Sequence, residues 1–251
     1  MGIQTDLSLS SPWMNAAGFG GFHPGGDWFL PERPGAFVTH PISWLAREPA
    51  HDRTLIEYPG GFLLHTGHPN PGFRAALRKY QSRWERSETP IWVHLLAEEP
   101  GSVHQMVCML ENIEAVVAIE ISLPPAVDIE RARDLLNAAY GEMPLVACLP
   151  VSEVESPWAQ ALAEFPLAAV ALTAPRGRLQ NGAGKWISGR LYGSGTFPFL
   201  TSAFFSLQRR TSLPLIFSGG IMRRSQAEML LKAGACAGQL DAALWRGWLA
   251  D

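Results

Sequence analysis

The chain has 251 residues, of which 47% are hydrophobic, so it is long enough to bury one sizeable core. Its formal net charge of −3 excludes the broad basic face that general nucleic-acid binding requires. No apolar run approaches the roughly 18 residues of a membrane span, and the first residues lack the pattern of a signal peptide. The cysteines Cys108, Cys148 and Cys236 have no paired spacing, which indicates a reduced compartment. We therefore expect a soluble cytoplasmic protein.

Eight short apolar segments predict buried β-strands. They are nearly all apolar rather than alternating, which is typical of parallel strands that are covered on both faces. In chain order they are residues 13–17, 35–39, 91–95, 115–121, 145–148, 168–172, 215–218 and 238–240.

Segments with one-sided apolar spacing lie between these strands and predict helices. In residues 101–112, for example, apolar side chains recur every three or four positions from Val103 to Leu110. Ser156 and Ser225 are candidate N-caps, because a serine hydroxyl accepts hydrogen bonds from free N–H groups at a helix start. The other predicted helices are residues 129–140, 158–164, 199–210 and 225–233.

Strands that alternate with helices predict a parallel sheet, and eight such units predict a closed (β/α)8 TIM barrel filling one domain, residues 1–251. An open doubly wound sheet is the alternative, but no Gly-x-Gly-x-x-Gly motif follows the first strand. Two connections are unusually long: an arm after strand 2 (residues 44–89) and a loop after strand 6 (residues 173–197). Both should lie over the C-terminal mouth, where barrel enzymes keep their sites. The second is interpreted either as a mobile lid or as an ordinary surface excursion.

Three motifs give the chain a resemblance to a known family. Asn-Ala-Ala-Gly (residues 15–18) ends the first strand, an arm rich in Pro, Gly and His spans residues 34–72, and Ser-Gly-Gly-Ile (residues 218–221) follows the seventh strand. Together they resemble the dihydroorotate dehydrogenase family, which are FMN enzymes on a (β/α)8 barrel. The resemblance implies FMN as cofactor, bound by Ala17, Gly18, Thr39, His40, Gly219 and Gly220.

The cofactor side departs from the family pattern at four positions. In the family a Gly-Thr pair after the eighth strand completes the phosphate cradle, and here Asp241 and Ala242 replace it. A carboxylate repels a phosphate, and alanine lacks a hydroxyl donor. Family lysines near the flavin match His40 and Cys148, and a neutral thiol cannot supply the charge of an ammonium group.

The substrate side departs further. In the family a Cys or Ser after the fourth strand takes the substrate proton, and here that position is Leu123, which cannot transfer one. Ser122 is the nearest substitute, but in an extended segment it should point to the opposite face. The substrate-holding asparagines match Leu64 and Leu172. The resemblance thus implies a divergent member with a degenerate active site that does not oxidise dihydroorotate.

Four polar residues replace family positions at the mouth and should converge there: His40, His94, Glu120 and Cys148. Such a set suits Zn²⁺, with His65 and His68 on the arm as further ligands or proton carriers. The alternative is a hydrogen-bonded polar cluster, and we assign no metal.

Three functional interpretations follow from the sequence. The chain is a divergent, dihydroorotate dehydrogenase-like flavin oxidoreductase, a non-flavin enzyme that uses the polar cluster, or a catalytically silent barrel acting as a subunit or regulator. In each case we expect a small-molecule ligand, no nucleic acid and no membrane, and a homo- or hetero-oligomer.

Overall fold

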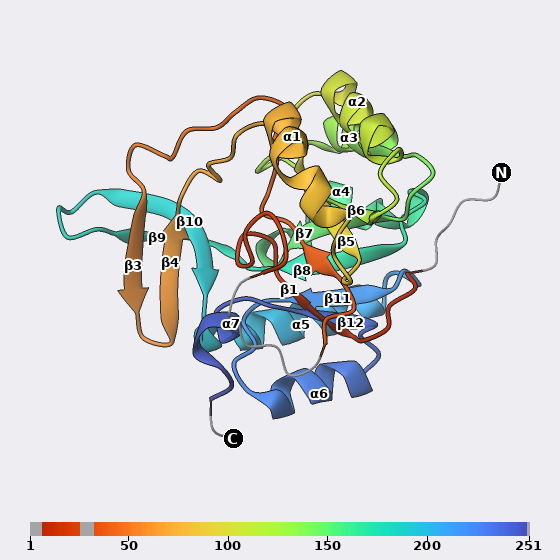
Figure 1. Ribbon diagram of the computed structural model, residues 1–251. Coiled ribbons are helices and arrows are strands. Elements are labelled where there is room, and N and C mark those ends of the chain that lie inside the picture. The colour runs from red at the N-terminus through yellow and green to blue at the C-terminus, as the bar shows by residue number, and fades with distance from the viewer. Residues whose placement is uncertain (1–6, 26–32, 250–251) are drawn as a thin grey trace.

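The computed structural model describes residues 7–25 and 33–249. Eight parallel strands form a barrel, and a four-stranded antiparallel sheet projects beside it (Figure 1). This confirms the predicted barrel. Around the barrel the strands follow the order β1-β12-β11-β8-β7-β6-β5-β2. Their bounds are β1 Trp13–Asn15, β2 Phe37–Val38, β5 Ile91–Leu96, β6 Val116–Ser122, β7 Leu145–Pro150, β8 Ala169–Thr173, β11 Leu215–Ser218 and β12 Ala237–Leu240.

The barrel closes between β1 and β2, where a side chain replaces part of the strand ladder. Met14 and Ala36 form a single parallel bridge, since β2 has only two residues. The fully buried Asn15 adds two bonds: its Nδ2 donates to the carbonyl oxygen of Val38 at 2.6 Å, and its Oδ1 accepts from the Val38 amide at 2.9 Å. Asn15 therefore supplies hydrogen bonds that a short strand cannot make by itself.

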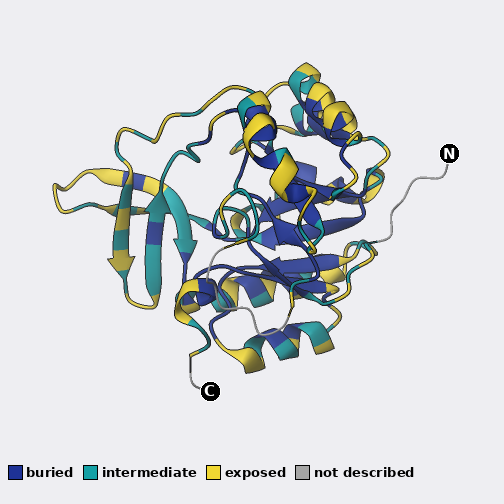
Figure 2. Ribbon diagram, in the orientation of Figure 1, coloured by how far each residue is buried: buried dark blue, intermediate teal, exposed yellow. Residues whose placement is uncertain are grey.

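The strands are buried on both faces, which explains their nearly continuous apolar sequences (Figure 2). Inside the barrel, the large Trp92 of β5 packs in a cluster with small residues such as Ala118, Ala169 and Ala237. Alternating large and small side chains fill a small barrel without voids. A second, larger cluster fills the layer between the strands and the helices.

Seven α-helices are described, and all five predicted helices are among them: α2 Pro100–Leu110, α3 Ile129–Ala139, α4 Pro157–Gln160, α5 Phe197–Gln208 and α6 Arg224–Lys232. The remaining two are α1 Phe73–Trp84 and α7 Ala243–Arg246, and 3-10 turns occupy Val151–Glu153, Leu162–Glu164 and Ser194–Thr196. None of these helices has the length and apolarity that crossing a membrane requires.

The two predicted N-caps have different outcomes. Ser156 caps α4 as expected, accepting a hydrogen bond from the Ala159 amide at 3.3 Å. The prediction for Ser225 was wrong, because α6 begins one residue earlier and Ser225 lies inside it. Arg223 is the N-cap instead, and its amide donates to the Gln226 side chain at 3.1 Å.

The two long connections fold together into one antiparallel sheet, which the sequence did not predict. The arm forms β3 (Thr54–Tyr58) and β4 (Gly61–His65), and the loop forms β9 (Arg176–Gln180) and β10 (Trp186–Tyr192). The order is β3-β4-β10-β9, so the arm and the loop pair directly through β4 and β10. Their half-exposed strands contrast with the buried barrel (Figure 2).

Replacing Asn15 by alanine should destabilise the barrel at its closure. Asn15→Ala leaves the buried amide and carbonyl of Val38 without their partners, which should lower the free energy of unfolding by about 2–4 kcal/mol. Urea unfolding followed by fluorescence measures this value. Asn112→Ala, which removes a hydrogen bond from an exposed side chain, is the control and should change it by less than about 0.5 kcal/mol. Equal stabilities of the two variants would contradict the assigned role.

Candidate functional site

Two adjoining cavities open at the C-terminal mouth of the barrel. The larger, the mouth cavity, has a volume of about 430 Å³, which is typical of a small-molecule site. The smaller, the inner cavity, has about 40 Å³. Residues that line both include Ala17, His68, Ser122, Arg190 and Tyr192. The mouth cavity is also lined by Gly18, Phe19, His40, Arg47, residues 64–67, 96–98 and 123–125, Arg176, Ser188 and Gly189.

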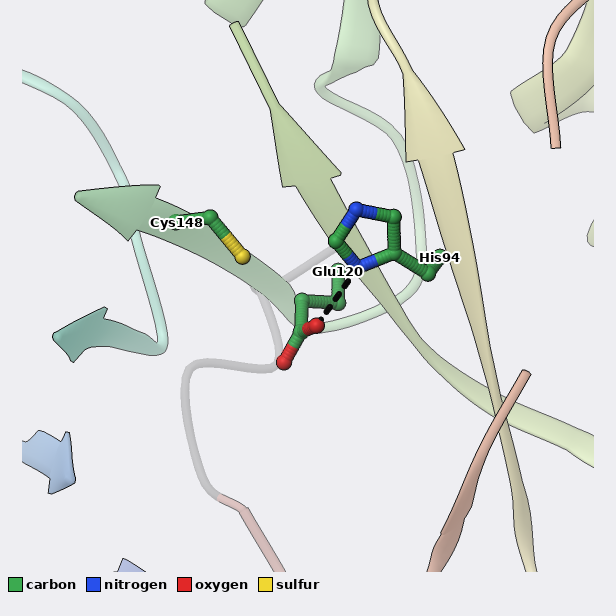
Figure 3. Close-up of side chains that lie close together, drawn as sticks. All are labelled: His94, Glu120 and Cys148. Atoms are coloured by element: carbon green, nitrogen blue, oxygen red, sulfur yellow. Dashed lines mark hydrogen bonds and ion pairs between the residues drawn. The ribbon is translucent and has the colours of Figure 1, made fainter. Parts of the chain in front are cut away.

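Three of the predicted polar residues converge inside the barrel (Figure 3). His94 of β5 and Glu120 of β6 are register partners, so their side chains point the same way. His94 Nδ1 lies 2.6 Å from Glu120 Oε1, and one ligand atom from each of His94, Glu120 and Cys148 lies within 4.8 Å of the others. Gln239 of β12 donates from across the barrel to Glu120 Oε2. Both oxygens of the buried carboxylate are therefore hydrogen-bonded.

Cys148 completes this group as a neutral thiol. It is buried, and burial together with the nearby Glu120 raises the pKa of the thiol well above its usual value. A metal bound here would have to displace the thiol proton and the hydrogen bonds that Glu120 already accepts.

His40, the fourth predicted member, lies near His94 but does not belong to the group of converging ligand atoms. It follows β2, where its amide donates to Gly21 O at 2.6 Å and its ring packs against Phe22 at 4.9 Å between centroids. Burial, then the nearby His94, lowers the pKa of His40 to about 4, and its buried Nε2 has no hydrogen-bond partner. The neutral imidazole lines the mouth cavity instead.

The histidines of the arm also face the mouth cavity, beside His40. Burial, then Arg190, lowers the pKa of His68 to about 3, so this imidazole is neutral as well. His65 ends β4 on the same cavity. Neither belongs to the group of three ligand atoms around Glu120.

The phosphate cradle expected after β11 and β12 is filled by a side chain of the protein. Gly219 and Gly220 form the turn after β11, both with positive φ. The buried Asp241 turns into this space: its Oδ2 accepts from the Gly220 amide at 3.0 Å, and its Oδ1 accepts from the Ala242 amide at 2.5 Å. The amides that would hold a phosphate are already bonded to a carboxylate. The residues after β12 therefore do not fit the phosphate of FMN.

The positions that match the family's substrate-binding residues are apolar. Leu123, at the position of the proton acceptor, is buried and lines the mouth cavity. Ser122 is the register partner of Cys148 and lines both cavities, whereas Leu123 also packs in the cluster between strands and helices, as alternation along an extended segment requires. Leu64 lines the cavity, whereas Leu172 packs in the layer between strands and helices. The mouth thus keeps Ser122 but lacks an aligned base.

Arginines are the functional side chains whose roles the sequence did not assign. Arg47 pairs with Glu98 at 2.6 Å, and Arg176 pairs with Glu153 at 3.2 Å. Arg190 has no carboxylate partner among the described residues; its Nη1 donates to Thr173 Oγ1 and Ala174 O, each at 3.2 Å. The sequence shows that the loop is cationic, but only strand pairing places Arg190 opposite Leu64 on the cavity.

The structure is a (β/α)8 barrel with a cavity at the C-terminal ends of its strands, which is where barrel enzymes keep their sites. No family model matches the chain. Curated relatives at 25–27% identity are catalytic subunits of dihydroorotate dehydrogenase B (NAD(+)), and they confirm the resemblance to dihydroorotate dehydrogenases.

The similarity extends over most of each chain. The relative from Pyrococcus furiosus is 25% identical over 236 residues, which cover 85% of this chain and 76% of the relative. The relative from Pelobacter propionicus is 27% identical over 262 residues, covering 94% and 84%.

Solved structures give weaker matches. Nitroalkane oxidase from Streptomyces ansochromogenes has a TM-score of 0.49 at 14% identity, covering 94% of this chain and 66% of its own. A FabK mutant from Thermotoga maritima has a TM-score of 0.41 at 15% identity, covering 67% and 47%.

The purified, untagged protein should contain well under one equivalent of zinc. Both Glu120 oxygens are hydrogen-bonded and the Cys148 thiol is neutral, so a metal would have to displace these interactions. Elemental analysis measures the content. Cys236→Ala, which removes an exposed thiol, is the control. The polar-cluster interpretation would be contradicted if the protein held nearly one equivalent of zinc, lost it in Cys148→Ala and kept it in the control.

Stability should depend on pH through Asp241. Burial raises the pKa of Asp241 to about 6 from 3.8, so the folded state holds this proton more tightly than the unfolded state. Stability from this group is therefore present at low pH and lost as pH rises through about 6, by roughly 2–3 kcal/mol. Urea unfolding of the protein and of Asp241→Asn between about pH 4 and pH 7 isolates the contribution, since other groups titrate in both. If the free energy of unfolding changed with pH in the same way for both proteins, Asp241 would not titrate in this range.

Proposed function

We propose that this chain is a flavin-binding oxidoreductase related to dihydroorotate dehydrogenases and that its substrate is not dihydroorotate. The observation that carries this is the similarity to dihydroorotate dehydrogenase B catalytic subunits over 85–94% of the chain. The turn of residues 15–18, a motif of the resemblance, contributes Ala17 and Gly18 to the mouth cavity, which is large enough for a heterocyclic ligand.

The flavin ring is expected against Ala17, Gly18 and His40, which all line the mouth cavity. A bound flavin would supply the hydride acceptor for substrate oxidation. The contribution of the chain is to orient the reactants and exclude water. The neutral imidazoles of His40 and His68 suit this role, since each can donate or accept one hydrogen bond without adding charge.

Arg190 indicates the chemical class of the proposed substrate. It is a half-buried cation without a carboxylate partner among the described residues, and it lines both cavities. An arginine in such a position binds a carboxylate through paired hydrogen bonds. We therefore expect a small, carboxylate-bearing substrate.

Dihydroorotate is disfavoured by what the mouth lacks. Its oxidation needs a base for the proton that leaves the ring carbon, and Leu123 occupies the position of that base in the family. Cys148, at the position of a family lysine, is a buried neutral thiol that provides no positive charge. The two changes remove both the proton acceptor and the electrostatic stabilisation.

A second candidate function is a catalytically silent barrel that acts as a subunit. The carboxylate in the phosphate cradle favours it, because the residues there do not fit FMN. The relatives are named catalytic subunits, so we propose a second protein subunit as partner in either case.

Dihydroorotate should not be turned over above background, with added riboflavin or FMN and common electron acceptors. Loss of a positioned base alone lowers the rate by about 10² to 10⁴. The assay is run together with a visible absorption spectrum of the desalted protein after incubation with each flavin. Retained flavin bands without dihydroorotate turnover are the expected result.

Two outcomes would contradict this proposal. Turnover of dihydroorotate by the unaltered protein would show that Leu123 does not disable the family reaction. Failure to retain either flavin would leave the silent subunit as the function. Leu123→Cys is the informative variant: restored turnover in it would show that the missing base was the only defect.

A further inference from the structure

The phosphate cradle holds a carboxylate that belongs to the protein. Asp241 accepts hydrogen bonds from the amides of Gly220 at 3.0 Å and Ala242 at 2.5 Å. These amides lie in the two turns where the family resemblance places the phosphate of FMN. A Cβ on Gly219 would lie 2.3 Å from Asp241 Oδ2, so the carboxylate packs tightly against this turn. Asp241 therefore occupies the space of the cradle and also places a negative charge there.

Two carboxylates, Asp241 and Glu120, and one cation, Arg190, line the inner cavity. Arg190 Nη1 donates to Thr173 and Ala174, and no ion pair among the described residues joins this cation to Asp241. A phosphate beside this buried carboxylate would place like charges in a poorly solvated space, where repulsion is strong. Moving Asp241 out would also leave its own charge without the two amide donors.

The same carboxylate is a good acceptor for a neutral donor. Each carboxylate oxygen has a further lone pair beyond the amide bond that it already accepts. Asp241 lines the inner cavity, which shares Ala17, Arg190 and Tyr192 with the mouth cavity. A ligand with its ring in the mouth cavity and a hydroxyl-bearing chain toward β12 therefore meets an acceptor where FMN carries its phosphate.

The geometry points to Asp241 as an internal replacement for the ligand phosphate, so that the barrel binds a phosphate-free polyhydroxyl ligand, riboflavin, in preference to FMN. This inference rests on the proposed flavin-binding function. It adds to that function which flavin is bound, riboflavin rather than FMN, and which residue, Asp241, distinguishes the two.

Flavin fluorescence quenching, titrated separately with riboflavin and FMN on the full chain, tests the inference. The unaltered protein should bind riboflavin at least about tenfold more tightly than FMN. Asp241→Asn removes the charge, and Asp241→Gly combined with Ala242→Thr restores the family pair, so both should shift the preference toward FMN. Asp134→Asn, which removes one exposed carboxylate on α3, is the matched control and should keep the preference for riboflavin.

The outcomes separate this inference from the proposed function. Equal or tighter binding of FMN by the unaltered protein overturns the role of Asp241 but leaves the flavin-binding function standing. Absence of binding of both flavins overturns the proposed function itself. Because the ratio is measured on the unaltered protein, a variant that fails to fold does not weaken the test. An unchanged ratio in a folded Asp241→Asn would assign the selection to another residue.

Discussion

The hydrogen bonds of Asn15 to Val38 are the interaction on which the mouth of this barrel depends. β2 contributes only two residues to the sheet, so its pairing with β1 rests on one bridge and on the Asn15 side chain. This closure holds the turn of residues 15–18 against the end of β2. The next residue, Thr39, accepts a hydrogen bond at its Oγ1 from the His94 amide at 3.0 Å. The closure therefore also fixes the position of His94 on β5.

The rim of the mouth depends on a second pairing between distant segments. β4 from the arm and β10 from the loop are 120 or more residues apart, yet they pair in register and place Arg190 opposite Leu64. Neither hairpin buries enough apolar surface to be stable alone, since most of their residues are half-exposed. Joined, they form one sheet that lines the mouth cavity with Arg176 and Arg190.

The distribution of charge in the site is reversed relative to the pattern implied by the family. There, lysines near the flavin supply positive charge and the ligand brings its phosphate. Here the barrel holds its own buried carboxylates, Glu120 bonded to His94 and Gln239, and Asp241 bonded to two amides. Positive charge is supplied instead by Arg190, which lines both cavities. A ligand for this mouth should therefore keep its negative charge near Arg190 and offer neutral donors to Asp241.

The sequence by itself determined the barrel, because strands covered on both faces are nearly all apolar. Such apolar runs can be identified in the sequence alone. The sequence also predicted that His94, Glu120 and Cys148 meet, since the ends of adjacent parallel strands share one rim. It missed the antiparallel sheet, whose half-exposed strands have no such pattern. Only the tertiary structure decided that His40 does not belong to the group of converging ligand atoms, that Gln239 reaches Glu120, and that Asp241 occupies the cradle. Those facts depend on barrel closure and side-chain direction, which sequence spacing does not encode.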